Sequence, residues 1–345
     1  MRILAATIVR NEGPYLLEWI AWHRLLGVTD FLFHSNDCDD GTDLLLDVLA
    51  GHGIVQHEPH HPLPGKSVQW GALRAAWRHD LRKVAEWMLI SDIDEFPVIH
   101  AGAGRIADLL AKLPDSSDAV ALPWRLFGSA GRIAISGQPV TQEFIRSAPS
   151  EMHFPVAATF FKSLFRPAAF RAAGVHRPRH RDGIVPLWVD GSGRPLPPEI
   201  ATNDKRLSLI GTDDGRRLVD LHHYSLRSAQ GFIVKADRGL PNRSVKRIDL
   251  GYWAERNFNT EENRAALRWG PQLAVETAAL RALPGVAALD QAALDWHRSR
   301  FDALCRTPEA YDLYTDVLLS QGSAALPLPL QDQLLRQFSM LQRND

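Results

Sequence analysis

The sequence has few cysteines and no long apolar run. Cys38 and Cys305 are the two cysteines among 345 residues, so we expect no disulfide framework, which is typical of a reducing compartment. No stretch approaches the roughly 18 consecutive apolar residues of a membrane-spanning helix. The apolar run at 2–9 is too short for the core of a secretion signal. We therefore expect a soluble, cytoplasmic protein.

An excess of charge of one sign is also absent, because the formal net charge is −1 at pH 7. Such a balance creates no field over the whole surface that would hold a nucleic acid, so we expect no nucleic-acid partner. Hydrophobic residues make up 45% of the chain. In a chain of this length they can fill the core of one large α/β domain with an extension, or of two modest domains.

Strands alternate with helices in the first part of the chain. Short apolar runs predict strands, and apolar residues at helical spacing predict helices. The expected strands are 2–9, 29–35, 53–57 and 87–91, and the helices between them are 15–26, 43–50 and 67–86. This order is typical of βαβ units. It predicts an α/β fold with a mostly parallel central sheet flanked by helices.

The pattern becomes less regular after residue 118 and then helical. Strand-like pieces at 119–124, 156–166 and 217–224 are separated by loops rich in glycine and proline. After residue 241 the chain is mostly helical, and two segments are typical of helix starts: Asn259 with Glu262, and Thr307 with Pro308. We predict an α/β domain over 1–240 and a helical C-terminal extension over 241–345.

The end of the strand at 87–91 carries the most informative motif, in which Asp92 and Asp94 follow an apolar run. Residues i and i+2 of an extended chain point to the same side, so both carboxylates can face one cation. Their oxygens suit Mg²⁺ or Mn²⁺, and a metal there would neutralise a leaving diphosphate. An acidic turn that merely ends a strand is the alternative. The position favours a metal site, because parallel sheets bind ligands beyond the carboxyl ends of their strands.

Several segments, taken in order, resemble glycosyltransferase family 2-like proteins of the family 92 type. These segments are 8–20, 23–28, 35–42, 65–70, 91–96, 124–129, 175–178 and 222–228, with Lys235 and Arg238 after them. The resemblance covers 3–240 and implies a GT-A fold, which is Rossmann-like. It also implies a nucleotide-sugar donor, with a UDP-sugar favoured, a divalent metal, Mn²⁺ or Mg²⁺, and inversion at the anomeric centre. The part at 1–240 would then be the catalytic domain.

The resemblance also implies a set of site residues, carried over by position. Those that would contact the nucleotide or the donor are Val9, Asn11, Glu12, Asp37 or Asp40, and Lys66. Asp92 and Asp94 would take the metal and the diphosphate. One histidine of the adjacent pair His222 and His223 would be a third metal ligand or a phosphate contact. We favour His222, with His176 as a second choice.

Glycosyl transfer also needs positive charge at the leaving diphosphate and a base for the acceptor hydroxyl. Lys235 and Arg238 are candidates for the charge, although together with Arg227 they could equally form a solvated basic face. Glu143 and Asp182 are candidates for the base, and Glu143 is preferred because its segment is similar to the family. A plain surface carboxylate is the alternative for each. Trp124 and Phe127 could wall the acceptor site or belong to the core.

The predicted function is therefore metal-dependent transfer of a sugar to a saccharide or glycoconjugate acceptor, as in polysaccharide biosynthesis. A lipid-linked acceptor would bring the protein to a membrane surface as a peripheral protein. Two other functions stay open. One is a phosphohydrolase with an aspartyl-phosphate intermediate, although its Asp-x-Asp motif normally follows the first strand. The other is a catalytically decayed module that binds a glycan or a nucleotide.

Overall fold

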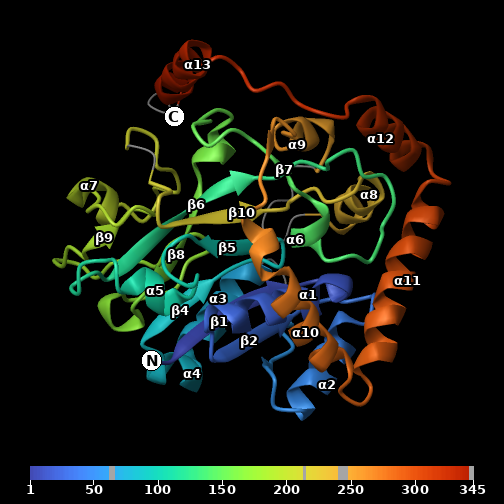
Figure 1. Cartoon of the computed structure of the whole chain (residues 1–345), viewed down its shortest axis with the longest axis horizontal. Coiled ribbons are helices and arrows are strands. Elements are labelled where there is room, and N and C mark those ends of the chain that lie inside the picture. The colour runs from blue at the N-terminus through green and yellow to red at the C-terminus, as the bar shows by residue number, and fades with distance from the viewer. Residues whose placement is uncertain (62–66, 213–214, 240–247, 342–345) are drawn as a thin grey trace.

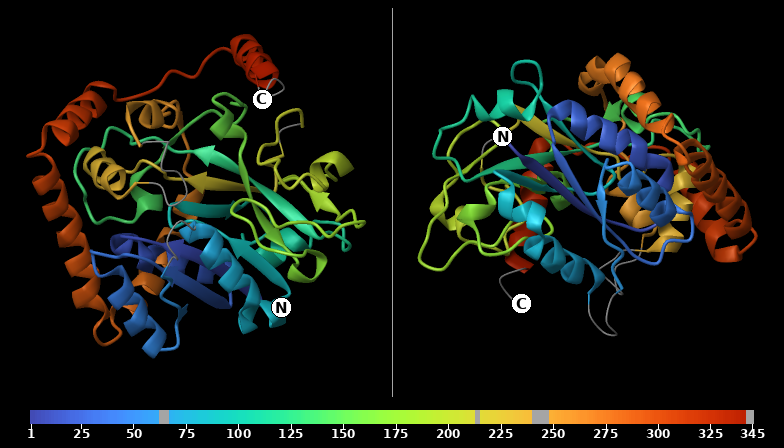
Figure 2. Two further views of the ribbon diagram at one scale, coloured as in Figure 1. Left: turned by 180° about the vertical axis from the view of Figure 1, so that it is seen from behind. Right: turned by 90° about the horizontal axis from the view of Figure 1, so that it is seen from below.

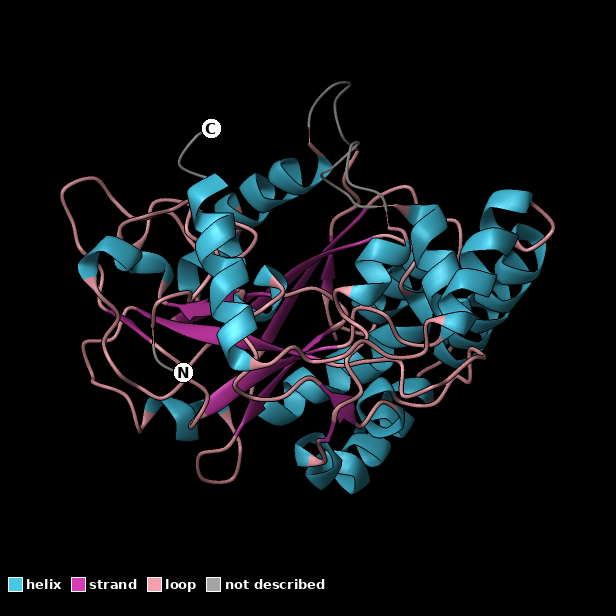
Figure 3. Ribbon diagram, turned by 90° about the horizontal axis from the view of Figure 1, so that it is seen from above, coloured by secondary structure: helices cyan, strands magenta, loops and turns pink. Residues whose placement is uncertain are grey.

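The computed structural model describes residues 1–61, 67–212, 215–239 and 248–341. Within these ranges nine strands form one sheet, with helices around it (Figures 1 and 3). The strands of the sheet are β1 (Ile3–Val9), β2 (Asp30–Ser35), β3 (Gln56–His57), β4 (Trp87–Ile90), β5 (Glu95–Ile99), β6 (Ala119–Leu126), β8 (Phe161–Phe165), β9 (Trp188–Val189) and β10 (Val219–His223). A separate two-stranded ladder joins β7 (Arg146–Ser147) and β11 (Glu261–Glu262).

The helices fall into two groups along the chain. Those of the first part are α1 (Gly13–Leu26), α2 (Thr42–Gly51), α3 (Val68–Arg78), α4 (Asp80–Val84), α5 (Ile106–Leu110), α6 (Val140–Glu143) and α7 (Pro198–Ala201). Those of the second part are α8 (Ala229–Arg238), α9 (Leu250–Ala254), α10 (Gly270–Arg281), α11 (Val286–Leu304), α12 (Pro308–Leu319) and α13 (Leu328–Leu341). The 3₁₀ helices are η1 (Val156–Thr159), η2 (Pro167–Ala169) and η3 (Ala265–Trp269). No helix in the described ranges is both long and apolar enough to cross a membrane.

The sheet is mixed, with the strand order β3-β2-β1-β4-β8-β6-β10-β5 and β9 beside β6. The four strands from β3 to β4 are parallel, and so are β6 and β10. Strand β8 runs antiparallel between β4 and β6, and β5 runs antiparallel to β10. The predicted α/β class, with a mostly parallel sheet and a helical C-terminal region, is confirmed. The antiparallel strand β5, which follows directly after the acidic motif, was not expected.

Alternate residues of the strands build two cores, one on each face of the sheet. Neighbouring residues of a strand point to opposite faces. Ile3 and Ala5 of β1 therefore belong to the core cluster that contains Trp19 of α1, whereas Leu4 belongs to the cluster that contains Leu73 of α3. Both faces are buried, which is why β4 is apolar throughout and β1 has Thr7 as its one polar residue.

The C-terminal helices pack on the first part of the chain. A third core cluster joins α8, α9, α11 and α12 through Phe232, Trp253, Phe301 and Val317. Helices α11, α12 and α13 follow one another in an arc around the sheet (Figures 1 and 2). A Cβ atom at Gly13 would lie 2.5 Å from the Cβ of Ala293, so the start of α1 must be glycine for α11 to approach. The domain boundary near residue 240 stays a prediction, because 240–247 lie outside the described residues.

Two local predictions were wrong and one is confirmed. The expected helix at 67–86 divides into α3 and α4 at His79, whose backbone is extended and whose ring caps α4 by accepting the N–H of Leu81. The helix expected to start at Asn259 is absent: Asn259 lies in a loop, and Glu261 and Glu262 form β11, which pairs with β7. The start of α12 lies at Pro308 as predicted, with Thr307 before it.

Candidate active site

The chain that leaves β4 turns sharply and holds two carboxylates at the edge of the sheet. The buried side chain of Glu95 stabilises this turn through hydrogen bonds. Its carboxylate accepts hydrogen bonds from the backbone N–H of Asp92 (2.8 Å) and from the hydroxyl of Ser91 (3.2 Å). The side chains of Asp92 and Asp94 are therefore presented at the carboxyl end of a buried strand, where the sequence predicts a ligand site.

Asp94 is buried and paired with a lysine from α8. The Nζ atom of Lys235 donates to Oδ2 of Asp94 over 2.7 Å and to the carbonyl oxygen of Ser225 over 2.7 Å. Nε2 of His223 lies 3.6 Å from Oδ1 of Asp94. Burial raises the pKa of Asp94, but the positive charge of Lys235 and the contact with His223 outweigh it and hold the pKa well below its usual value.

Asp92 is paired with a second lysine, Lys162 of β8, which the sequence reasoning missed. The side chain of Lys162 is fully buried, with Nζ 2.9 Å from Oδ2 of Asp92 and 3.4 Å from Oε2 of Glu95. Burial lowers the pKa of Lys162, but the two carboxylates raise it by more, so this lysine stays charged. Burial raises the pKa of Glu95 to about 8, against the effect of Lys162. A lone lysine inside the apolar run at 160–165 was the available signal.

Glu12, which follows β1, forms ion pairs with two arginines. Nη1 of Arg227 donates to Oε2 of Glu12 over 2.9 Å, and Nη1 of Arg238 donates to Oε1 of Glu12 and, over 2.7 Å, to the carbonyl oxygen of Arg10. Burial raises the pKa of Glu12, but Arg227 and Arg238 reverse the shift and lower it. The guanidinium carbon of Arg227 also lies 3.3 Å from the ring centroid of Tyr15.

These contacts define a charge cluster at the carboxyl edge of the sheet. Its members are Glu12, Asp92, Asp94, Glu95, Lys162, Arg227, Lys235 and Arg238. The cluster contains four carboxyl groups and four cations, and its ion pairs join them across several elements. Among the described residues, the buried Nε and Nη2 of Arg227 and Nδ1 of His223 have no hydrogen-bond partner. The two unpaired guanidinium nitrogen atoms of Arg227 favour an anionic ligand.

The two adjacent histidines of β10 face opposite sides, as neighbouring strand residues must. His223 faces Asp94. His222 points the other way, with Nδ1 3.1 Å from the hydroxyl oxygen of Tyr224 and Nε2 3.5 Å from Oδ1 of Asp220. The preference for His222 as the ligand is therefore corrected: the geometry places His223 beside the acidic motif, and His222 belongs to the packed interior.

The aromatic residues considered for the acceptor site also divide between the two faces. The ring of Trp124 lies beside His223, with centroids 4.0 Å apart, and beside His176 at 5.4 Å. Phe127 packs against His222 at 4.4 Å and is fully buried. Both side chains belong to the same buried core cluster, and only Trp124 also lies beside His223, so it alone stays a candidate wall for a ligand.

The residues expected to contact the nucleotide differ in their burial and in their hydrogen-bond partners. Val9 is buried at the end of β1, and the side-chain oxygen of Asn11 accepts the N–H of Asp39 over 2.7 Å. Asp37 is exposed beside Arg10, whose Nε donates to its carbonyl oxygen over 3.1 Å. Lys66 lies outside the described residues.

Asp40 is occupied by structural contacts. Its carboxylate accepts the N–H groups of Gly13 (3.0 Å) and Thr42 (2.8 Å) and lies 3.0 Å from Nε2 of His297 on α11. Its side chain is fully buried. The alternative that Asp40 contacts the nucleotide is therefore corrected, because its oxygen atoms hold α1, α2 and α11 together. Asp37 keeps that role as a prediction.

Neither candidate base contacts the charge cluster. Glu143 ends α6 and accepts a hydrogen bond from the hydroxyl of Ser136, while Arg132 lies 3.7 Å away. Helix α6 is held from α1, because the buried carboxylate of Glu18 accepts the N–H groups that open α6. Asp182 is exposed in the loop before β9. The structure gives neither carboxylate a contact with Asp92 or Asp94 among the described residues.

The expected metal ligands do not assemble. Among the residues that the structure describes, no three His, Cys, Asp or Glu side chains come together in a group that could hold a metal ion. His222 faces away, and Asp92 and Asp94 each give one carboxylate oxygen to a lysine. In this arrangement the residues do not fit a resident Mn²⁺ or Mg²⁺.

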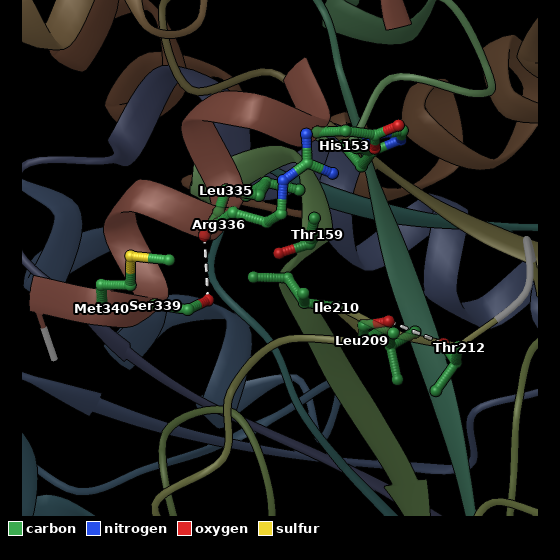
Figure 4. A pocket seen from close by; sticks show the side chains of 11 residues that line it. His153, Thr159, Leu209, Ile210, Thr212, Leu335, Arg336, Ser339 and Met340 are labelled. Carbon is green, nitrogen blue, oxygen red and sulfur yellow. Dashed lines mark hydrogen bonds and ion pairs between the residues drawn. The ribbon is translucent and has the colours of Figure 1, made fainter. Parts of the chain in front are cut away.

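A pocket of about 500 Å³ lies under α13 (Figure 4). Thr159, Leu209 and Ile210 line it from one side, and Leu335 and Arg336 of α13 line it from the other. The pocket adjoins the chain that leads into β8, because Leu209 donates its N–H to the carbonyl oxygen of Thr159 over 2.9 Å. It thus lies near the end of β8 that carries Lys162.

With this geometry in place, the comparisons identify the family. The sequence matches the family described as Glycosyltransferase family 92 over residues 6–189. The match covers more than half of the chain, so the protein belongs to glycosyltransferase family 92. The matched part contains Glu12, Asp92, Asp94 and Lys162, whereas the cations of α8 lie beyond it.

Two plant proteins of the same family are among its curated relatives. One from Ricinus communis is 27% identical over 188 residues, which cover 52% of this chain and 31% of that protein. One from Oryza sativa subsp. japonica is 28% identical over 178 residues, which cover 50% of this chain and 28% of that protein. The matched region of this chain spans about a third of the length of these relatives.

Similarity to solved structures is weak. The S. aureus TarS fragment 1–349 has a TM-score of 0.34 and 13% identity, with coverage of 93% of this chain and 89% of that chain. Glucosyl-3-phosphoglycerate synthase from Mycobacterium tuberculosis, in complex with Mn²⁺, UDP and glucosyl-3-phosphoglycerate, has a TM-score of 0.24 and 17% identity. This match covers 36% of this chain and 44% of that chain. These values are too low to support statements about ligands.

Proposed function

We propose that this protein transfers a sugar from a nucleotide-sugar donor, with a UDP-sugar favoured, to a hydroxyl group of a saccharide or glycoconjugate acceptor. The observation that carries the proposal is the charge cluster, which lies at the carboxyl edge of the sheet in a member of glycosyltransferase family 92. Arg227, with its unpaired Nε and Nη2, and the other cations of the cluster would stabilise the phosphates of the donor.

The proposed reaction exchanges one bond to the anomeric carbon for another. The bond from the anomeric carbon to the diphosphate oxygen breaks, and its electron pair stays on the nucleoside diphosphate. The acceptor oxygen forms the new bond and gives its proton to a base. Inversion follows if the acceptor attacks from the side opposite the diphosphate, and it stays a proposal from the family resemblance. Glu143 and Asp182 are the proposed bases, and either would need to approach the acceptor in the complex.

Two sources of positive charge come into question for the leaving diphosphate, one expected from the family resemblance and one present in the structure. The family resemblance implies a divalent metal, Mn²⁺ or Mg²⁺, and the charge cluster supplies lysine and arginine side chains. The acceptor, a peripheral contact with a membrane through a lipid-linked acceptor, and a cytoplasmic location belong to the proposal as expectations from the sequence.

Nucleotide binding tests the proposal directly. Thermal unfolding is measured with UDP, GDP, CMP and TDP, each in Mn²⁺ and in EDTA, for the wild type and for Asp94→Asn. A ligand at about 100 times its Kd stabilises the folded state by roughly 2.7 kcal/mol. We expect one nucleotide to raise the Tm of the wild type and to have a much smaller effect on Asp94→Asn. The exposed Asp115→Asn is the matched control and should respond like the wild type.

A positive result names the nucleotide of the donor. The matching nucleotide sugars are then tested for slow hydrolysis, which needs no known acceptor. If no nucleotide shifts the Tm in either condition, the transferase proposal fails. A phosphohydrolase or a decayed binding module would then be the better description.

A further inference from the structure

We propose that the ammonium groups of Lys162 and Lys235, and not a divalent metal, supply the positive charge that stabilises the diphosphate of the donor. Asp92 and Asp94 hold these two ammonium groups in place. This inference rests on the proposed function and goes beyond it, because it assigns the electrostatic role to two side chains of this chain. It departs from the metal that the family resemblance implies. The ground is the arrangement of the two lysines, since each one occupies an oxygen atom of the acidic motif.

Lys162 is a cation that cannot leave its position without opening the sheet. It lies on β8, between β4 and β6, and is opposite Leu122 in the ladder. Its side chain is 0% exposed, and its Nζ is held by Asp92 at 2.9 Å and by Glu95 at 3.4 Å. An ammonium group that is buried this deeply persists only with carboxylate partners. Its charge is therefore fixed beside the only exposed carboxylate of the cluster, that of Asp92, whose side chain is 42% exposed.

Lys235 is also held in place, and it comes from helix α8 and not from the sheet. Ser228 caps the N-terminus of α8, because its hydroxyl accepts the N–H of Gly231, and the apolar face of α8 is buried with Phe232. This packing aims Lys235 at Asp94 over 2.7 Å, with a second bond of 2.7 Å to a backbone carbonyl. The two aspartates therefore hold two ammonium groups from two different elements.

The two ammonium groups disfavour a divalent cation at this place, because each already occupies an oxygen atom of the acidic motif. A divalent ion bound by Asp92 and Asp94 would lie close to Lys162 and Lys235, and like charges at such distances repel strongly in a partly buried site. A diphosphate beside Asp92 would instead lie in the favourable field of the two ammonium groups. When the bond to the anomeric carbon breaks, the electron pair left on the diphosphate would be stabilised by these groups.

The test compares nucleotide affinity with and without a metal. The probe is the nucleotide that binds best in the thermal screen, titrated by calorimetry in EDTA and in Mn²⁺. For the wild type we expect the Kd to change by less than about threefold between the two conditions. Lys235→Met should weaken binding in EDTA by at least about tenfold, because it removes a charged hydrogen-bond donor. Lys83→Met, an exposed lysine paired with Asp80, is the control and should bind like the wild type.

A second variant gives the sharper result. Lys235→Ala leaves Asp94 without its ammonium partner, so Mn²⁺ should be able to take that place. We expect Mn²⁺ to restore part of the lost affinity in Lys235→Ala, while it adds nothing to the wild type. Lys162→Met should show the same pattern if it folds, as circular dichroism would report. Because Lys235 is near the surface of the cluster, its variants keep the test valid even if Lys162→Met does not fold.

The outcomes separate the two proposals. The inference is overturned if the wild type binds the nucleotide in Mn²⁺ and loses it in EDTA, while Lys235→Met binds normally; the proposed transferase function then still stands. If no nucleotide binds to the wild type in either condition, both proposals fall together. Binding in EDTA that depends on Lys235 supports the inference.

Discussion

The ring of His23 lies against the ring of Trp19 one turn earlier in α1, with the ring centroids 3.9 Å apart and Nδ1 of His23 2.8 Å from the Trp19 carbonyl oxygen. The histidine is completely buried, and this burial lowers its pKa from 6.5 to about 3, although the hydrogen bond opposes the shift. The unfolded chain therefore binds a proton near pH 6.5 and the folded chain does not. The contribution to stability is complete above pH 6.5 and is lost as the pH falls toward 3.

We predict that His23→Phe changes this dependence on pH. Below about pH 6.5 the wild type should lose up to ~1.4 kcal/mol of unfolding free energy per pH unit through His23, and the variant should not. Urea unfolding of both proteins between about pH 7.5 and 4.5 measures the difference. An equal substitution at the exposed His61 should leave the slope as in the wild type. A constant difference between His23→Phe and the wild type over this range would contradict the prediction.

The contact between Asp40 and His297 gives a prediction about the C-terminal helices. Asp40→Asn keeps the size of the side chain but removes a carboxylate that accepts two backbone N–H groups and pairs with His297. We expect a loss of ~2–4 kcal/mol in unfolding free energy at pH 7, measured in urea. Hydrogen exchange in α11 should rise more than exchange in β4. Asp115→Asn is the control, and equal exchange in α11 for both variants would show that Asp40 does not hold this helix.

The two histidines of β10 should respond differently to truncation. His223→Ala removes a group beside Asp94, so we expect nucleotide affinity to fall by about tenfold with little loss of stability. His222→Ala opens a buried position against Phe127, so we expect a loss of ~1–3 kcal/mol in unfolding free energy and unchanged affinity. Calorimetric titration and thermal unfolding of both variants distinguish the two effects. The reverse pattern would restore the preference for His222.

Gln331 anchors α13, the helix whose Leu335 and Arg336 line the pocket of Figure 4. Its side-chain oxygen accepts the N–H groups of His153 and Phe154, both over 3.0 Å, and it is 2% exposed. Gln331→Ala leaves these groups unpaired, so α13 should open more often. We expect proteolysis in the segment 320–327 to speed up about 10- to 100-fold, and Gln333→Ala, exposed on the same helix, should have no such effect. Equal cleavage rates for the two variants would refute this.

Much of the fold follows from local pattern. The strands β1, β2 and β4 and the helices α1 and α2 were predictable, because the strands are short apolar runs buried on both faces of the sheet and the helices have apolar residues at helical spacing. The position of Asp92 and Asp94 was predictable for the same reason. Strand β5 was not, since it begins within one residue of the acidic motif and its pairing with β10 joins residues that are far apart in the chain.

The partners of the acidic motif depend on this long-range order. A lysine in an apolar run is ambiguous until it is known that β8 is inserted between β4 and β6, where Lys162 meets Asp92. The choice between His222 and His223 depends on the register of β10 against β5, which puts His223 opposite Glu95. Asp40 seemed free for a ligand because His297, its partner, lies 257 residues later in the chain.

The separation of 141 residues between Asp94 and Lys235 also sets an order of events on the ribosome. At about 5–20 residues per second, α8 emerges roughly 7–28 s after the turn that follows β4. During this interval Asp94 and Glu12 have neither their lysine nor their arginines, so their carboxylates must stay hydrated at an unfinished sheet edge. The parallel half of the nascent protein can therefore form early, but this edge can close only after translation has passed residue 238.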